Sequence, residues 1–140
     1  GGSMVERGSG GRVINIASIS GIVCNRDIGG RSYETSKAAV IQFTRAVASD
    51  WTAAGVTVNA ICPGLTDTER LSGMASGLKP EGTTTEEYRQ ELIGQNEALT
   101  PLGRIAQPQD VAQAAAFLSS DEASFVTGQS VNVSGGAWMG

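Results

Sequence analysis

Apolar residues in this chain occur either in short runs or in longer stretches with helical spacing. A short run such as Val13, Ile14 and Ile16 is typical of a parallel strand that is buried on both faces. Longer stretches with an apolar residue every three or four positions indicate helices. The pattern predicts strands at 12–18, 55–61 and 129–133, and helices at 32–54, 67–78, 85–94 and 107–120.

These elements alternate as in an α/β fold: strand, helix, strand, two short helices, helix, strand. Right-handed crossovers then place the three strands side by side and parallel. One strand–helix–strand unit takes roughly 30 residues, so a complete six- or seven-stranded dinucleotide-binding sheet needs roughly 200 or more. The 140 residues of this chain therefore predict only part of such a sheet.

The first residues contribute little to the predicted fold. Gly1–Ser3 has the composition of a linker or tag scar, with natural N-terminal residues as the alternative. Residues 4–7 are expected to form the last turn of a helix, and 8–11 a glycine-rich turn.

The stretch 32–54 is the longest predicted helix, with Ser32 as its cap and Gly55 as its stop. Its apolar positions cover so wide an arc that burial on two sides is expected. One side should lie on the sheet, and the other should be either a subunit interface or the floor of a loop. The positions are Ala39, Val40, Ile41, Phe43, Ala46, Val47, Ala48 and Trp51.

Composition and charge exclude several functions. Hydrophobic content of 40% and charged content of 17% are ordinary for a soluble protein. A net charge of -4 without a basic cluster argues against a nucleic-acid partner. No apolar run is long enough for a membrane span, and no signal peptide is visible. Cys24 and Cys62 lack metal or redox spacing, so two reduced thiols in a cytoplasmic protein are expected.

The chain contains no histidine. This removes Ser-His-Asp and Cys-His catalysis and most zinc sites, and no metal site is predicted. Any proton chemistry must use tyrosine, lysine, serine or carboxylates.

Tyr33 and Lys37 are the best candidates for that chemistry. Positions i and i+4 share one face of a helix, so the phenol and the ammonium can reach one spot. A nearby cation favours the phenolate, which would let Tyr33 give and take a proton. Ser18, at the end of the preceding strand, would hold the substrate oxygen whose proton moves. Ser20 would lie on the same face of that strand and is the alternative for this role. The alternative for the pair is a surface tyrosine beside a solvated lysine.

The segment Pro63–Thr68 follows the second predicted strand. Ligands of open α/β sheets bind beyond the C-terminal ends of the strands, so this segment is expected to belong to the site. The alternative is a plain turn followed by a helix cap.

Five sequence blocks, in order, resemble the C-terminal part of the short-chain dehydrogenase/reductase family. The resemblance covers residues 4–140 and is strongest to ketoacyl-reductase-like and sugar- or polyol-dehydrogenase-like members. The blocks are Gly11–Ser18, Tyr33–Ala39, Val58–Gly64, Pro101–Arg104 with Pro108–Ala112, and Thr127–Gln129 with Val133–Gly136.

The resemblance implies a Rossmann-like domain, of which this chain holds the last three of seven strands. It implies NAD- or NADP-dependent hydride transfer between a nicotinamide and a small-molecule carbonyl or alcohol. Tyr33 would be the acid/base and Lys37 would bond the nicotinamide ribose. The family pattern Asn-Ile-x-Ser favours Ser18 over Ser20.

For the cofactor, the resemblance implies contacts from Tyr33 and Lys37 and from the segment after the second strand. In that segment the contacts come from Pro63, Gly64, the backbone near Leu65 and the hydroxyl of Thr68, the last two to the carboxamide. It also implies a mobile substrate lid at 67–94 and a homo-oligomer built on helix 32–54. Met74, Leu71 and Leu78 could line an apolar pocket or belong to the core. The loop 21–31 is about two residues longer than in many members, and Ala106 and Ser134 depart from the usual glycine and aspartate.

Two parts of the family pattern are absent from this sequence. No glycine-rich turn for the cofactor pyrophosphate follows a strand, and the upstream catalytic asparagine is missing. Asn15 lies before Ser18 in its strand and is not expected to replace it. The residue that selects NAD or NADP would also lie upstream. The isolated chain is therefore expected to have little turnover, and the alternative function is an inactive fragment or assembly module.

Overall fold

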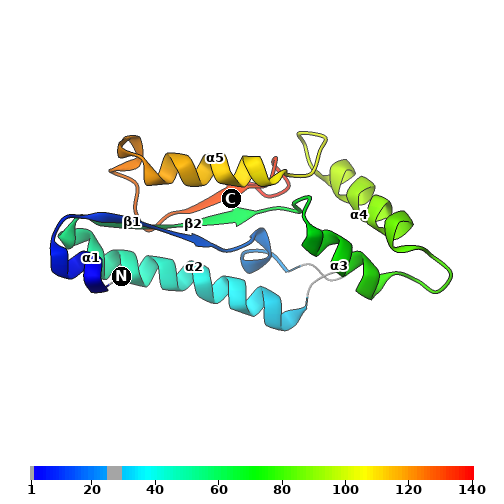
Figure 1. Ribbon diagram of the computed structural model, residues 1–140, viewed down its shortest axis with the longest axis horizontal. Helices are drawn as coiled ribbons and strands as arrows, with labels where there is room; N and C mark the ends of the chain where they lie inside the picture. Colours follow the sequence, from blue (N-terminus) through cyan, green and yellow to red (C-terminus); the bar gives the residue numbers. More distant parts are fainter. Residues whose placement is uncertain (1, 25–29) are drawn as a thin grey trace.

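A three-stranded parallel sheet forms the centre of the fold (Figure 1). The computed structural model describes residues 2–24 and 30–140. The strands are β1 (Gly11–Ile16), β2 (Val56–Pro63) and β3 (Ser130–Val133), and they lie in that order. The α/β class and the parallel arrangement predicted from the sequence are confirmed.

Five α-helices surround this sheet in the described part of the chain. Three short 3-10 turns accompany them at Ile19–Gly21, Thr52–Ala54 and Asp121–Ala123. The α-helices are α1 (Gly2–Arg7), α2 (Arg31–Trp51), α3 (Glu69–Leu78), α4 (Thr85–Leu99) and α5 (Pro108–Ser119).

The central strand β2 is the core of the molecule. Val56, Val58 and Ile61 have no exposed surface, because helices cover both faces of this strand. Helix α2 covers one face and α5 the other (Figure 1). In contrast, the expected burial of the first strand on both faces is wrong. Ile16 is 49% exposed, since β1 pairs only with β2 among the described residues.

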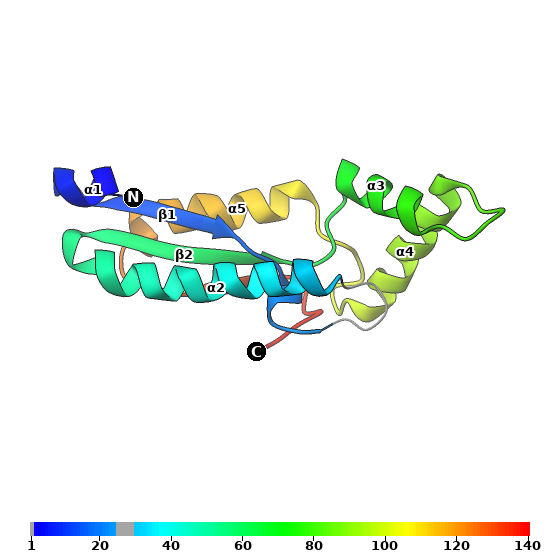
Figure 2. The same cartoon turned by 90° about the horizontal axis from the view of Figure 1, so that it is seen from below.

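Helices α3 and α4 form a separate layer beyond the C-terminal ends of the strands (Figure 2). They pack on each other through a small apolar cluster, and Arg89 of α4 forms an ion pair with Asp67 ahead of α3. In this layer α4 extends five residues past its predicted end, because Gly94 is tolerated within the helix and Pro101 lies beyond it. The cluster consists of Leu71, Ala75, Leu92 and Ile105.

Of the two predicted ends of the long helix, one differs from the structure. Gly30 occupies the N-cap position of α2 without any side-chain hydrogen bond, so the expected Ser32 cap is wrong; Ser32 lies one residue inside the helix. The predicted stop at Gly55 is confirmed, because this residue has a φ of 74° and donates its N–H to the Thr52 carbonyl. At the N-terminus, Gly2 and Ser3 belong to α1, and their origin as a linker stays a prediction. Of the loop 21–31, residues 25–29 lie outside the described part of the chain.

The buried side chain of Asn59 ties β2 to the segment that leads into β3. Its Nδ2 donates to the Val126 carbonyl at 2.8 Å, and its Oδ1 accepts from the Gln129 N–H at 3.0 Å. Asn59 is only 1% exposed, so both ends of its amide need partners within the protein, and these two backbone groups provide them. This explains why an asparagine stands in the middle of an otherwise apolar strand.

An ion pair connects the turn at Pro101–Arg104 to the first turn of α5. The Arg104 guanidinium donates to both carboxylate oxygens of Asp110 at 2.7 and 2.8 Å. Asp110 also accepts from the Gln107 N–H at 2.7 Å. The Arg104 guanidinium, and then this backbone donor, hold the pKa of Asp110 well below its usual range.

We expect Asn59→Ala to lower the free energy of unfolding by roughly 2–3 kcal/mol, because it removes the two hydrogen bonds that join β2 to the segment before β3. Urea denaturation of the two proteins measures the difference. Asn15→Ala is the matched control, since it removes one side-chain hydrogen bond to Thr44 and should cost roughly 1 kcal/mol. Equal losses for the two variants would contradict this account of Asn59.

Asp110→Asn should lower the Tm at pH 7 and have little effect in acid. The pKa of Asp110 is depressed in the folded state, so its stabilisation is complete above the unfolded-state pKa of about 3.9. It is lost as the pH falls below that value toward the folded-state pKa. Thermal melts between pH 2.5 and 7 test this; Asp50→Asn, at an exposed position of α2, should not produce a gap that closes in acid.

Candidate active site

A cavity of about 600 Å³ lies beyond the C-terminal ends of β1 and β2. The N-terminal part of α2 and one face along the length of α3 form its sides. The structure brings every sequence-predicted site residue to this one cavity, although no assignment of their roles follows from position alone. These residues are Ser18, Tyr33, Lys37, Pro63, Gly64, Leu65 and Thr68.

Lys37 and Tyr33 share one face of α2, as their spacing predicts. The Lys37 ammonium donates to the Ile16 carbonyl at 2.9 Å, which fixes it at the end of β1. From there its Nζ lies 5.7 Å from the centre of the Tyr33 ring. Two of its three N–H groups remain available to a ligand or to the phenol.

Ser18 follows β1 and begins the 3-10 turn Ile19–Gly21. Its side chain is 8% exposed, and its Oγ accepts from the Ser20 N–H at 3.1 Å. A hydroxyl that accepts one bond can still donate its own hydrogen. Ser20 also lines the cavity, so position alone does not decide which of the two serines holds the substrate oxygen. The backbone of Ser20 instead orients the hydroxyl of Ser18.

The segment after β2 is held as a shaped loop and not as a simple turn. The Gly64 N–H donates to the Val133 carbonyl, and Thr66 pairs with Ala106 in an isolated bridge. A side chain at Gly64 would press on Ser134, with a Cβ only 3.2 Å from its Cα. Thr68 occupies the N-cap position of α3 but makes no cap bond; its hydroxyl donates a long hydrogen bond, of 3.5 Å, to the Thr66 carbonyl.

Among the described residues that line the cavity, the charged side chains are both positive. Lys37 and Arg70 are its two charged residues among the described residues, and no aspartate or glutamate lines it. The guanidinium of Arg70 lies 4.4 Å from the centre of the Tyr33 ring, on a chain whose net charge is -4. Sequence reasoning did not single out Arg70, because an arginine on a predicted helix is usually a solvated surface residue.

The remaining lining comes from one face of α3 and from α4. Leu71, Met74 and Leu78 line the cavity. Leu71 also belongs to the apolar cluster between α3 and α4, and Met74 packs against it, so both alternatives hold here. Asn96 of α4 reaches the same cavity and was not predicted, since no local pattern marks it. Its Nδ2 donates to the Leu92 carbonyl at 2.8 Å.

Three other residues from the sequence analysis lie outside this lining. The side chain of Asn15 donates to Thr44 at 2.9 Å. Both cysteines are free thiols; Cys24 is exposed and Cys62 is buried in β2, where burial raises the pKa of its thiol.

Across residues 2–24 and 30–140, no helix combines the length and apolarity that a membrane crossing needs.

Comparisons with known proteins agree with this geometry. A family model described as enoyl-(acyl carrier protein) reductase matches residues 2–137. Galactitol 2-dehydrogenase (L-tagatose-forming) of Cereibacter sphaeroides is 41% identical, over 97% of this chain and 48% of that protein. The 3-oxoacyl-[acyl-carrier-protein] reductase of Vibrio cholerae is 35% identical, over 92% of this chain and 46% of that protein.

A solved structure shows the same fold. The 3-oxoacyl-[acyl-carrier protein] reductase of Brucella melitensis with bound NAD matches with a TM-score of 0.79 and 33% identity. The match covers 99% of this chain and 45% of that one. The chain therefore belongs to the short-chain dehydrogenase/reductase family. It spans about half the length of the curated relatives it matches.

Proposed function

We propose that the protein is an NAD(P)-dependent oxidoreductase that interconverts a carbonyl compound and a secondary alcohol. The observation that carries this proposal is the convergence of Ser18, Tyr33 and Lys37 on one cavity at the strand ends. Relatives named as dehydrogenases and reductases of such compounds support it. The proposal concerns the whole protein, because the matched relatives are about twice as long as this chain.

In the reductive direction, the Tyr33 hydroxyl gives its proton to the substrate oxygen as this oxygen becomes an alcohol. The Ser18 hydroxyl donates a hydrogen bond to the same oxygen and holds it against the phenol. Lys37, fixed by the Ile16 carbonyl, places a positive charge where the phenolate forms and stabilises it. In the oxidative direction the same groups move the proton the other way.

The residues present fit a nicotinamide cofactor. A carboxamide and a ribose need hydrogen-bond donors and acceptors, and Thr68, Lys37 and the backbone of Pro63–Leu65 offer both at the cavity wall. Gly73 leaves room on the opposite wall, since a Cβ there would meet nothing within 4 Å. When bound, the cofactor supplies or accepts the hydride, which no side chain can do.

We further propose that residues 4–140 form the C-terminal part of a Rossmann-like domain, completed by the segment that binds the cofactor phosphates. The open edge of β1 supports this, because an unpaired parallel strand offers N–H and C=O groups to a neighbour. The alternative is that the protein lacks such a segment and acts as an inactive fragment or assembly module.

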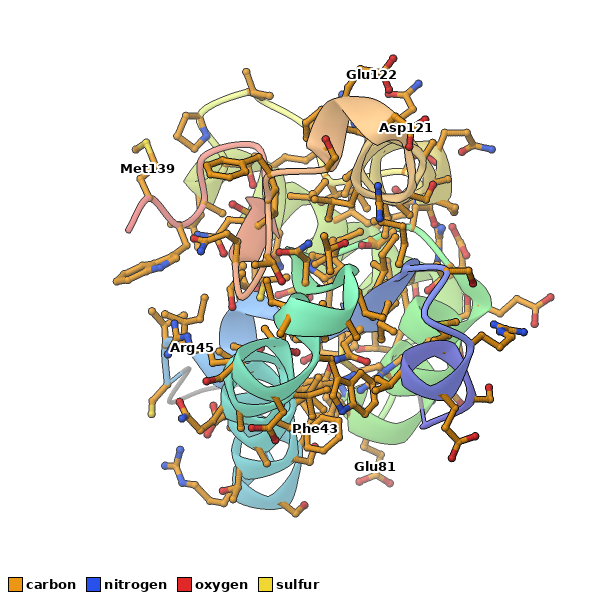
Figure 3. The ribbon with its side chains drawn as sticks, turned by 90° about the vertical axis from the view of Figure 1, so that its left-hand side faces the viewer. Phe43, Arg45, Glu81, Asp121, Glu122 and Met139 are labelled. Atoms are coloured by element: carbon orange, nitrogen blue, oxygen red, sulfur yellow. The ribbon has the colours of Figure 1, made fainter. Side chains whose placement is uncertain are left out.

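Assembly is proposed to use the outward face of α2. Ile41, Thr44 and Ala48 face the sheet, while Phe43 is 59% exposed. Phe43 and Arg45 project from opposite sides of α2 (Figure 3). An exposed phenylalanine flanked by small residues at helical spacing is suited to packing against a second copy of the helix.

Tyr33→Phe should lower kcat/KM by about 10²- to 10⁴-fold, because the proton donor is lost while the ring stays. The measurement is NADH or NADPH oxidation by the full-length protein with a panel of carbonyl compounds. Binding of NADH and NADPH, followed by fluorescence titration, should be retained. Tyr88→Phe is the control, since Tyr88 packs between α3 and α4. Full activity of Tyr33→Phe, or no binding of either cofactor by the wild type, would refute the proposal.

Phe43→Glu should reduce the assembly to a smaller species, because it introduces a charge into a packed apolar contact. Light scattering after size-exclusion chromatography measures the mass. Gln42→Glu adds the same charge at a neighbouring exposed position of α2 and should keep the wild-type mass. An unchanged mass for Phe43→Glu would place the interface elsewhere.

A further inference from the structure

Arg70 connects α3 to the predicted acid/base. It is the second residue of α3, and its guanidinium lies over the Tyr33 ring, 4.4 Å from the ring centre. Contact between a guanidinium and an aromatic face is favourable, and it leaves the N–H groups at the edge of the guanidinium plane free to bind a ligand.

The contact with an aromatic ring distinguishes Arg70 from the other described arginines. Arg12, Arg31, Arg89 and Arg104 each have a carboxylate within ion-pair distance. Arg7, Arg45 and Arg70 have none within the described ranges, and of these three only Arg70 lies over an aromatic ring, that of Tyr33. Helix stability does not explain it either, because a cation in the first turn opposes the helix dipole.

The position of Arg70 on α3 directs it toward the cavity. It shares one helical face with Gly73, Met74, Gly77 and Leu78, all of which line the cavity at i, i+3, i+4, i+7 and i+8. Two of these neighbours are glycines at which a Cβ would meet nothing within 4 Å. The charged group therefore stands on a wall with open space beside it.

Arg70 is also the positive charge that the proposed chemistry leaves unused. Lys37 is committed to the Ile16 carbonyl and, under the proposed function, to the phenol and the ribose. No carboxylate among the described lining residues neutralises Arg70. A planar guanidinium with free N–H groups is the side chain best suited to a carboxylate or a phosphate.

We propose that Arg70 determines substrate specificity by binding an anionic group, a carboxylate or a phosphate, that the substrate carries within a few bonds of its reacting carbon. This rests on the proposed function, because it takes the Tyr33 hydroxyl as the group that meets the reacting oxygen. Arg70 and Tyr33 then contact two ends of the same small molecule.

Matched substrate pairs test this in the full-length protein with NADH or NADPH. Each pair differs mainly in the anionic group: acetoacetate and methyl acetoacetate, pyruvate and methyl pyruvate, dihydroxyacetone phosphate and dihydroxyacetone. The wild type should prefer the anionic member of at least one pair. Arg70→Gln should lower kcat/KM for that member about 10- to 100-fold, mostly through KM, and should affect the neutral member far less.

Two further variants sharpen the result. Arg70→Lys keeps the charge without the planar fork and should give an intermediate preference. Arg7→Gln is the matched control, since Arg7 is an exposed arginine of α1 at the far end of the sheet, and it should keep the wild-type preference (Figure 1). An unchanged preference in Arg70→Gln overturns the proposal, as does a change confined to the KM of the cofactor.

Inorganic phosphate provides a readout that needs no turnover. Isothermal titration calorimetry should show its Kd rising about tenfold or more in Arg70→Gln and staying unchanged in Arg7→Gln. If no pair is turned over, this titration decides: equal affinity in Arg70→Gln overturns the proposal. A failure of the proposed function gives other results: the wild type binds neither cofactor, or Tyr33→Phe keeps full activity.

Discussion

The parallel pairing of β1 with β2 is the constraint on which the rest of the site depends. Gly11 lies opposite Val56 and Ile16 opposite Ile61, so the C-terminal ends of both strands meet at one edge of the sheet. Each strand continues there into a short polar segment. Ser18 and the loop after Pro63 thus reach one cavity although 45 residues separate them in the sequence. The deep burial of β2, secured by Asn59 on one side and covered by helices on both faces, fixes this register.

Apolar packing and one hydrogen bond together place α2 against that edge. Ile41 of α2 packs on Ala17 and Ala60. The Lys37 ammonium bonds to the Ile16 carbonyl at the end of β1. Tyr33, one helical turn earlier, is thereby fixed relative to Ser18. The same bond satisfies a carbonyl at the exposed end of an edge strand. Structural and proposed chemical roles of Lys37 are therefore linked, and removing its side chain would disturb both.

Much of this could be predicted from the sequence because it depends on short-range patterns. The i, i+4 spacing of Tyr33 and Lys37 fixes their common face, and the apolar run before Ser18 fixes the strand that delivers it. The prediction of Ser32 as the N-cap was wrong, because the N-cap position depends on where the preceding loop joins the helix. Local composition does not determine that point. Arg70 and Asn96 were missed for another reason. They belong to the site because α3 and α4 pack beyond the sheet. The periodicity of residues within either helix does not predict where the helix packs.

The face of α3 that closes the cavity combines three kinds of surface in ten residues. Arg70 offers a positive charge beside Tyr33, Gly73 and Gly77 offer space, and Met74 and Leu78 offer apolar contact farther along. A ligand that suits all three has its anionic end near the phenol and its less polar part toward the end of the helix. The order of these surfaces along α3 follows directly from the sequence. Their relation to the proposed chemistry follows from the contact between Arg70 and Tyr33. Under the two proposals, this contact joins the helix that selects the substrate to the tyrosine that transfers the proton.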